Sequence, residues 1–166
     1  MNQQPVTPVS ADMRFRAYEA YFREYLTEKL YRNVFNAACF LQVLLGSAFM
    51  ADIAKGWVAG LASTAIASYI FVYNPSATSR SAREQSVRYE KIIHHLNTLT
   101  DAEISSKFSS LCDTDSRVPD RLMSAAYILA DTAIHGATEK TMILKNNLTY
   151  SERLVVLISG CLIKTK

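Results

Sequence analysis

The aspartates of one short stretch are the side chains best suited to holding an ion, but their spacing does not match a metal site. Asp113, Asp115 and Asp120 lie close together in the sequence. Carboxylates could bind a divalent cation, yet the glycine and the closing glutamate of an EF-hand loop do not follow at the required positions. We therefore interpret the three aspartates as a solvated loop followed by the start of a helix.

The histidines are equally poor candidates for chemistry. His94 and His95 are adjacent, so on a helix their side chains point about 100° apart and do not converge on one ion. His135 precedes a glycine and suits the C-terminal end of a helix, where a cation faces the negative end of the dipole. The sequence also contains no Gly-rich phosphate loop and no nucleophile elbow. We expect a non-enzymatic protein with no metal and no cofactor.

The dominant feature of the chain is an apolar stretch over residues 34–73. Two uncharged runs, Val34–Ala51 and Trp57–Tyr73, flank a short polar segment that contains Asp52 and Lys55. Each run has roughly 17–18 residues, close to the length that a helix needs to cross about 30 Å of hydrocarbon. A charge-free run of this length is uncommon in the core helix of a soluble protein. We predict a two-helix transmembrane hairpin, and the alternative is a pair of buried helices in a soluble bundle.

Small and polar residues recur at helical spacing within both runs. The first run has four on one face, Asn36, Cys39, Gln42 and Gly46. The second run has two neighbouring ridges, Ala59, Ser63 and Ala67 and then Gly60, Thr64 and Ser68. Small ridges let helices approach closely in lipid, and polar side chains on membrane helices face protein or water. Two ridges exceed what one hairpin needs, so we expect a homo-oligomer. Two alternatives stay open: the ridges serve packing within one hairpin alone, or some of these residues line a lumen. The candidate pore-lining or helix-packing residues are Asn36, Gln42, Gly46, Gly60, Ser63, Thr64 and Ser68.

Cations flank the apolar stretch on both sides and are scarce in its turn. Five precede the first run, and the turn has only Lys55. Those that follow the second run are Arg80, Arg83, Arg88 and Lys91. By the positive-inside bias, both termini are predicted to be cytoplasmic and the hairpin to contact the lipid bilayer. The cations cluster beside the apolar runs rather than forming a nucleic-acid face, so no nucleic acid is expected as a partner.

Every element outside the apolar stretch is predicted to be helical, so the expected fold class is all-α. Residues 1–9 are predicted to be a disordered tail, and residues 10–33 a cytoplasmic amphipathic helix capped by Ser10. Residues 74–166 are predicted to form a cytoplasmic helical bundle. No proline or glycine separates the first helix from the first apolar run, so the sequence allows one continuous helix.

Local signals predict where the cytoplasmic helices begin and end. Asn74-Pro75 should end the second apolar helix, and Ser76–Ser81 should connect it to the next one. Capping boxes that predict helix starts are Ser81 with Glu84, Thr100 with Glu103, and Thr149 with Glu152. The last apolar run, Leu154–Ile163, is too short to span a bilayer. It fits either a helix docked on the cytoplasmic core or a helix against the inner leaflet.

This order of elements, a charged helix, two apolar helices with a short turn and a helical tail, resembles the SLATT family of bacterial membrane proteins. The matching positions are Tyr31-Arg32-Asn33, Ser81-Ala82-Arg83 through Tyr89, Leu99-Thr100-Asp101-Ala102-Glu103, and Pro119, Leu122 and Ala126 up to Gly136. The resemblance implies a place in the bacterial inner membrane and a nucleotide-sensing or nucleotide-synthesising partner protein in anti-phage systems. It also implies an effector that oligomerises and permeabilises the membrane when that partner signals infection. The alternative is a membrane-anchored, non-enzymatic scaffold whose cytoplasmic helices bind a partner.

Overall fold

The computed structural model of the chain describes residues 9–50 and 56–161. Nearly all of the tail predicted over residues 1–9, and the polar turn between the apolar runs, lie outside these ranges. Within them every regular element is a helix, which confirms the all-α fold class.

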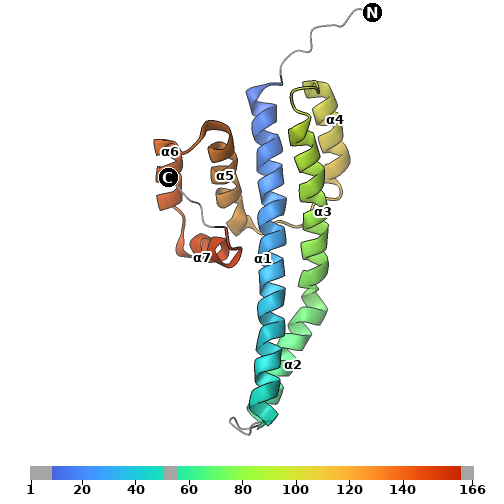
Figure 1. Cartoon of the computed structure of the whole chain (residues 1–166), viewed down its shortest axis with the longest axis vertical. Coiled ribbons are helices and arrows are strands. Elements are labelled where there is room, and N and C mark those ends of the chain that lie inside the picture. Colours follow the sequence, from blue (N-terminus) through green and yellow to red (C-terminus); the bar gives the residue numbers. More distant parts are fainter. Residues whose placement is uncertain (1–8, 51–55, 162–166) are drawn as a thin grey trace, which may run out of the picture.

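One long helix organises the molecule. Helix α1 (Ala11–Met50) is a single uninterrupted helix of 40 residues, as the sequence allows. Its start follows Ser10, whose hydroxyl accepts a hydrogen bond from the Met13 amide at 3.3 Å. Figure 1 shows α1 running the length of the molecule, with the other helices arranged beside it. The predicted amphipathic helix and the first apolar run are therefore two halves of one element.

The return path consists of two helices laid end to end. Helix α2 (Gly56–Tyr73) lies beside the C-terminal half of α1, and α3 (Pro75–His94) lies beside its N-terminal half (Figure 1). Between them, Asn74 has left-handed geometry (φ 40°) and its side chain accepts a hydrogen bond from the Ala77 amide at 3.3 Å.

This junction corrects two predictions about the chain after the second apolar run. Ser76–Ser81 is helix rather than a connection, and Ser81 with Glu84 is not a helix start, because α3 already begins at Pro75. Asparagine tolerates the left-handed region and proline suits the first turn of a helix, so the chain starts a new helix at once.

Helix α4 (Asp101–Cys112) folds back on α3 at the N-terminal end of α1 (Figure 1). Thr100 and Glu103 form the predicted capping box, in which the Glu103 carboxylate accepts from the Thr100 amide at 2.8 Å. The apolar core on this side of α1 consists of Ala17, Tyr89, Ile92, Leu96 and Ile104. Val87 of α3 lies outside this core, and its side chain is exposed.

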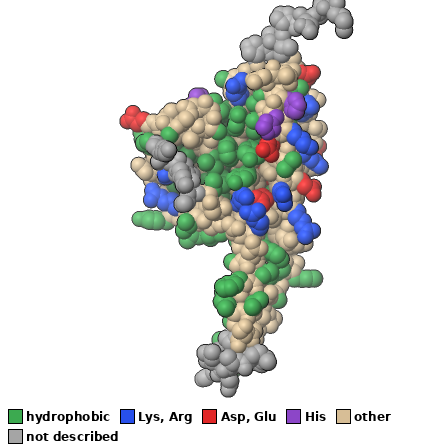
Figure 2. Space-filling model, in the orientation of Figure 1, with side chains coloured by type: hydrophobic (Ala, Val, Ile, Leu, Met, Phe, Trp, Pro, Cys, Tyr) green, Lys and Arg blue, Asp and Glu red, His purple; other side chains and the backbone are tan. Residues whose placement is uncertain are grey.

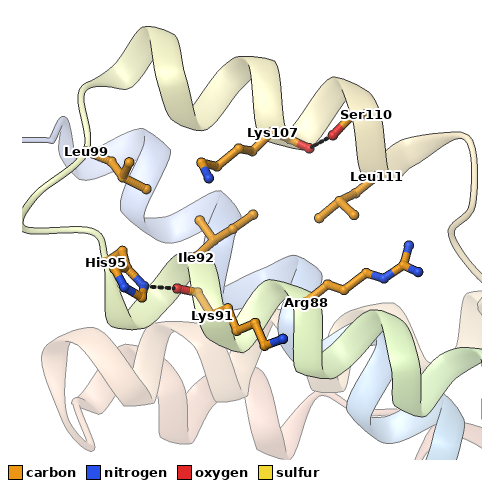
Figure 3. Close-up of a pocket in the computed structure, with 8 residues that line it drawn as sticks. All are labelled: Arg88, Lys91, Ile92, His95, Leu99, Lys107, Ser110 and Leu111. Atoms are coloured by element: carbon orange, nitrogen blue, oxygen red, sulfur yellow. Dashed lines mark hydrogen bonds between the residues drawn. The ribbon is translucent and has the colours of Figure 1, made fainter.

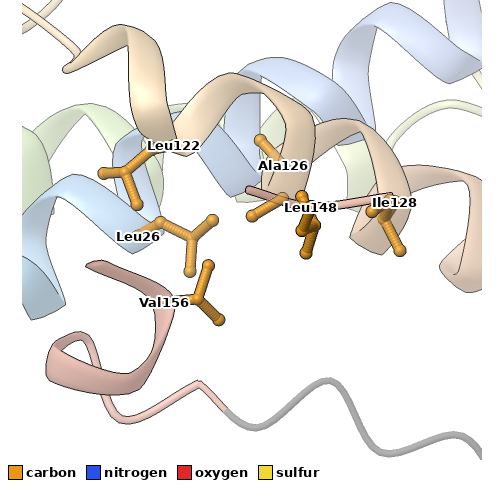
Figure 4. Packing of buried hydrophobic residues seen from close by; sticks show 7 residues of the cluster. Leu26, Leu122, Ala126, Ile128, Leu148 and Val156 are labelled. Atoms are coloured by element: carbon orange, nitrogen blue, oxygen red, sulfur yellow. The ribbon is translucent and has the colours of Figure 1, made fainter. Parts of the chain in front are cut away.

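The chain then crosses to the opposite side of α1 and forms a short 3-10 helix, η1 (Asp120–Leu122), followed by three more helices. These are α5 (Met123–His135), α6 (Glu139–Asn146) and α7 (Tyr150–Ile158). The core on this side consists of Leu26, Leu122, Ala125, Ala126, Ile128, Leu148 and Val156 (Figure 4). Gly136 (φ 78°) ends α5, and Thr149 with Glu152 caps α7, both as predicted. Helices α3 to α7 and the first half of α1 make up what we call the body.

Candidate functional site

Beyond the body, α1 and α2 continue as a two-helix stalk, defined as residues 34–50 and 56–73 (Figure 1). Within Gly56–Tyr73, Ala59 alone is buried. Large side chains exposed on the stalk are Phe40, Leu41, Val43, Leu44, Trp57, Val58, Leu61, Tyr69, Phe71, Val72 and Tyr73. Figure 2 shows apolar side chains on the surface of the stalk, with Lys and Arg gathered above it on the body. The stalk is therefore apolar on the outside, the reverse of a soluble helix pair.

One helical stretch, Gly56–His94, is long and apolar enough to cross a membrane among the residues that could be searched. It comprises α2 and the more polar α3, and its most apolar part is α2. The second predicted span, formed by the C-terminal half of α1, stays a prediction.

The two small-residue ridges of α2 point to different sides. Ala59 is buried and Ser63 is half-buried, so this part of the first ridge faces α1, whereas Ala67 is exposed. Gly60, Thr64 and Ser68 are exposed. A Cβ built on Gly60 would meet no other atom within 4 Å, so the second ridge is open in the single chain.

The polar residues of the first run do not share one environment. Cys39 and Gln42 are half-buried on the same side of α1 as the buried Ala38, whereas Asn36 and Gly46 are exposed. The predicted single face of four residues is therefore divided between the contact with α2 and the outer surface. A Cβ built on Gly46 also meets nothing within 4 Å.

A buried carboxyl group in the body escaped the sequence reasoning. The side chain of Glu24, on α1, is almost fully buried, and its Oε1 accepts a hydrogen bond from the Ser116 amide at 2.9 Å. Its Oε2 is buried without a hydrogen-bond partner in the described part of the chain. Burial raises the pKa of Glu24 to about 7, against the lowering effect of the hydrogen bond from Ser116.

Glu24 belongs to a polar junction that holds the chain where it crosses α1 between α4 and η1. Tyr89, also buried, donates its hydroxyl to the Asp115 carboxylate at 2.9 Å. Gln85 donates to the Thr114 carbonyl at 2.6 Å. Side chains of α1 and α3 therefore bind three consecutive residues of the crossing, Thr114, Asp115 and Ser116. The junction fixes the two sides of the body relative to each other.

The aspartates and histidines are dispersed. Asp113 and Asp120 are exposed, and Asp115 faces Tyr89. His135 Nδ1 lies 3.1 Å from the Asp131 carboxylate one turn earlier on α5. Among the residues described, no three His, Cys, Asp or Glu side chains are placed to hold a metal ion.

A cleft of about 350 Å³ opens between α3 and α4, at the end of the body far from the stalk (Figures 1 and 3). Ile92 and Leu111 contribute apolar walls, and Arg88 and Lys107 contribute charge. Figure 3 shows the charged ends of Arg88 and Lys107 in different parts of the cleft, so they do not converge on one anion.

Helix α7 lies crosswise to α1 beside the base of the stalk (Figure 1). The Asn33 side chain donates to the Ile158 carbonyl at 2.7 Å. The end of α7 therefore contacts α1 at the residue just before Val34, where the predicted membrane span begins. Val156 is buried in the core, but Tyr150, Leu154 and Leu157 are exposed, with exposed fractions of 92%, 57% and 65%. The run Leu154–Ile163 was predicted either to dock on the cytoplasmic core or to lie against the inner leaflet. One face of α7 docks on the body, and the opposite apolar face is uncovered.

Comparison with known proteins identifies no relative: no family model, no curated protein and no solved structure matches the chain.

Proposed function

We propose that the protein is a membrane effector whose stalk inserts into the bacterial inner membrane as a two-helix hairpin. Both termini are cytoplasmic, and the hairpins assemble into an oligomer that permeabilises the bilayer. The observation that carries the proposal is the exposed apolar surface of α2, on which Ala59 is the one buried residue.

The energetics favour lipid over water for the stalk. Transferring one large apolar side chain out of water is worth about 1.5–3 kcal/mol. Eleven such side chains are 38–88% exposed on the stalk, and the exposed part of their transfer free energy is comparable with the net stability of a typical domain, about 5–15 kcal/mol. The stalk segments also lack Asp, Glu, Lys and Arg, so in the inserted hairpin neither segment holds a charge within the hydrocarbon.

The dimensions of the stalk suit a bilayer. The 18 residues of α2 rise about 27 Å, close to the hydrocarbon thickness of about 30 Å. The Thr64 hydroxyl donates to the Gly60 carbonyl within its own helix at 2.9 Å, so the hydroxyl is satisfied without water. The uncovered face of α7 would rest on the inner leaflet beside the stalk.

Assembly is supported by the open ridge of Gly60, Thr64 and Ser68. Ala59 and Ser63 of the first ridge pack toward α1, so the exposed second ridge remains for another copy. The role in phage defence, and the nucleotide-signalling partner that would trigger assembly, rest on the resemblance to the SLATT family.

Leakage from cells tests the proposal. Expression of the full chain in a bacterium should place it in the membrane fraction and release a small cytoplasmic dye. Recovery of the chain from the supernatant without detergent would contradict membrane insertion. Membrane recovery with no leakage at any expression level would contradict the effector and favour the anchored scaffold.

A further inference from the structure

A small hollow lies where the stalk meets the body. It has a volume of about 190 Å³ and is formed by α1 on one side and the start of α3 on the other. Arg32 and Phe35 line it from α1, and Ser76, Arg80 and Arg83 line it from α3. Three guanidinium groups from two helices therefore surround one cavity.

The charge around the hollow is positive. Glu28 also lines it, and its carboxylate lies 2.9 Å from Arg32 and 3.7 Å from Lys29. Arg80 and Arg83 are exposed, and neither makes an ion pair with the described part of the chain. Among the residues that line the hollow, one carboxylate, Glu28, stands against the three arginines, so the lining carries a net excess of cations. Two of these guanidinium groups are free to bind an anion.

The height of the hollow matches the lipid headgroups. Arg32 precedes the first apolar run by two residues, and Arg80 follows Tyr73 by seven, which is about 10 Å along the helix at 1.5 Å per residue. The headgroup layer adds roughly 5–8 Å on each side of the hydrocarbon, within reach of an arginine side chain. Phe35, one turn beyond Arg32 toward the stalk, provides an apolar wall on the side of the hydrocarbon.

We propose that this hollow binds the phosphate of an anionic phospholipid of the inner leaflet, with the lipid's glycerol and upper acyl chain against Phe35. The proposal rests on the membrane insertion proposed above. Guanidinium groups bind phosphate oxygens in a bidentate manner, and basic pockets beside membrane helices on the cytoplasmic side are suited to anionic headgroups. The bound lipid tethers α1 to α3 at the membrane surface.

Native mass spectrometry of the full chain, released from bilayer discs, tests this site. Discs are made of phosphatidylcholine with or without phosphatidylglycerol, and the retained lipids are counted. The wild-type chain should retain phosphatidylglycerol in preference to phosphatidylcholine. Arg80→Gln with Arg83→Gln should weaken that retention by about fivefold or more for each charge removed.

A matched control uses the same helix farther from the membrane. Arg88→Gln with Lys91→Gln removes the same charge from exposed positions of α3 and should leave the retention unchanged. Equal loss in both pairs would overturn the site in favour of unspecific surface charge. Circular dichroism melting should give the same midpoint for both pairs, because all four side chains are exposed.

Two further outcomes separate the sources of the phosphate and the two proposals. Inorganic phosphate or glycerol phosphate should not displace the lipid; displacement at concentrations comparable with the lipid would overturn the lipid assignment in favour of a soluble ligand. A chain that incorporates into discs without selecting phosphatidylglycerol overturns the lipid site alone. A chain that does not incorporate into discs overturns the proposed membrane insertion, and the lipid site with it.

Discussion

At the scale of single residues, Glu24 is unusual because an ionisable side chain occupies a buried position. Its carboxyl is buried on the central helix, where a charge is costly unless it is paired. One oxygen is held by the Ser116 amide and the other has no partner in the described chain. The crossing between the two sides of the body is therefore fixed by a group whose ionisation is opposed by burial.

The raised pKa of Glu24 predicts a stability that depends on pH. The folded chain holds the proton up to about pH 7, whereas the unfolded chain loses it near pH 4.5. Stability should therefore fall as pH rises from about 4.5 to 7 and level off above that range, by at most about 3 kcal/mol. Glu24→Gln should remove this dependence and raise the unfolding midpoint at pH 8. Circular dichroism melting in detergent at pH 5 and pH 8 measures both effects, and a midpoint at pH 8 unchanged by the substitution would contradict them.

Local signals in the sequence predict residues whose role is local. The capping boxes at Thr100 and Thr149 are confirmed because both partners lie within one helical turn. Glu24 could not be found in this way, because its partner is 92 residues away in sequence. The sequence did contain one signal for Glu24. Glu24 and Thr27 lie at helical spacing on the face of α1 that buries Ala17 and Leu26, so this pattern puts polar residues at core positions.

At the scale of elements, α7 combines a docked face and an uncovered one. Val156 and Ser159 are buried, and residues on the opposite side of the helix are exposed. The sequence showed that Leu154–Ile163 is too short to span a bilayer, but it could not show which face docks. That choice depends on the packing of α5 and on the hydrogen bond from Asn33.

The proposed placement of α7 on the inner leaflet can be tested with a fluorescent reporter. In a Trp57→Phe background, Tyr150→Trp should be quenched by brominated lipids in vesicles, because the side chain at 150 is 92% exposed on the uncovered face. Ile143→Trp is the control, since Ile143 is an exposed residue of the neighbouring α6. Equal quenching of the two tryptophans, or none at 150, would contradict the placement.

At the scale of the whole molecule, the sequence predicted the elements better than their assembly. The apolar runs, the all-α class and most helix ends follow from composition and capping residues. These signals depend on residues that are close together in the sequence. The division of the body into two sides around α1 depends on contacts between distant segments. The candidate residues of the stalk are likewise separated by packing, with Ser63 against α1 and Gly60 on the open side.

If the chain assembles through the open ridge, a large side chain at position 60 should prevent the oligomer from forming. Gly60→Leu should fold and insert normally, because Gly60 is exposed and a Cβ there meets nothing within 4 Å in the single chain. It should nevertheless abolish the oligomer and reduce dye leakage at least tenfold, since a small residue is needed where helices approach closely. Crosslinking in membranes and the leakage assay measure the two effects.

The control for this prediction adds similar bulk elsewhere on α2. Ala65 is exposed, and five residues from Gly60 place it about 140° around the helix. Ala65→Leu should leave crosslinking and leakage intact. Loss of the oligomer in both variants would show that assembly does not depend on the open ridge.

The unbroken length of α1 has a mechanical consequence. Its 40 residues form a rod of about 60 Å, which packs against the other helices of the body along its first half and against α2 along its second half. Because no break separates the two halves of α1, they should move together as one unit. In the proposed membrane arrangement, a tilt that a partner imposed on the N-terminal half of α1 would therefore move its C-terminal end through a larger distance, at the opposite face of the bilayer.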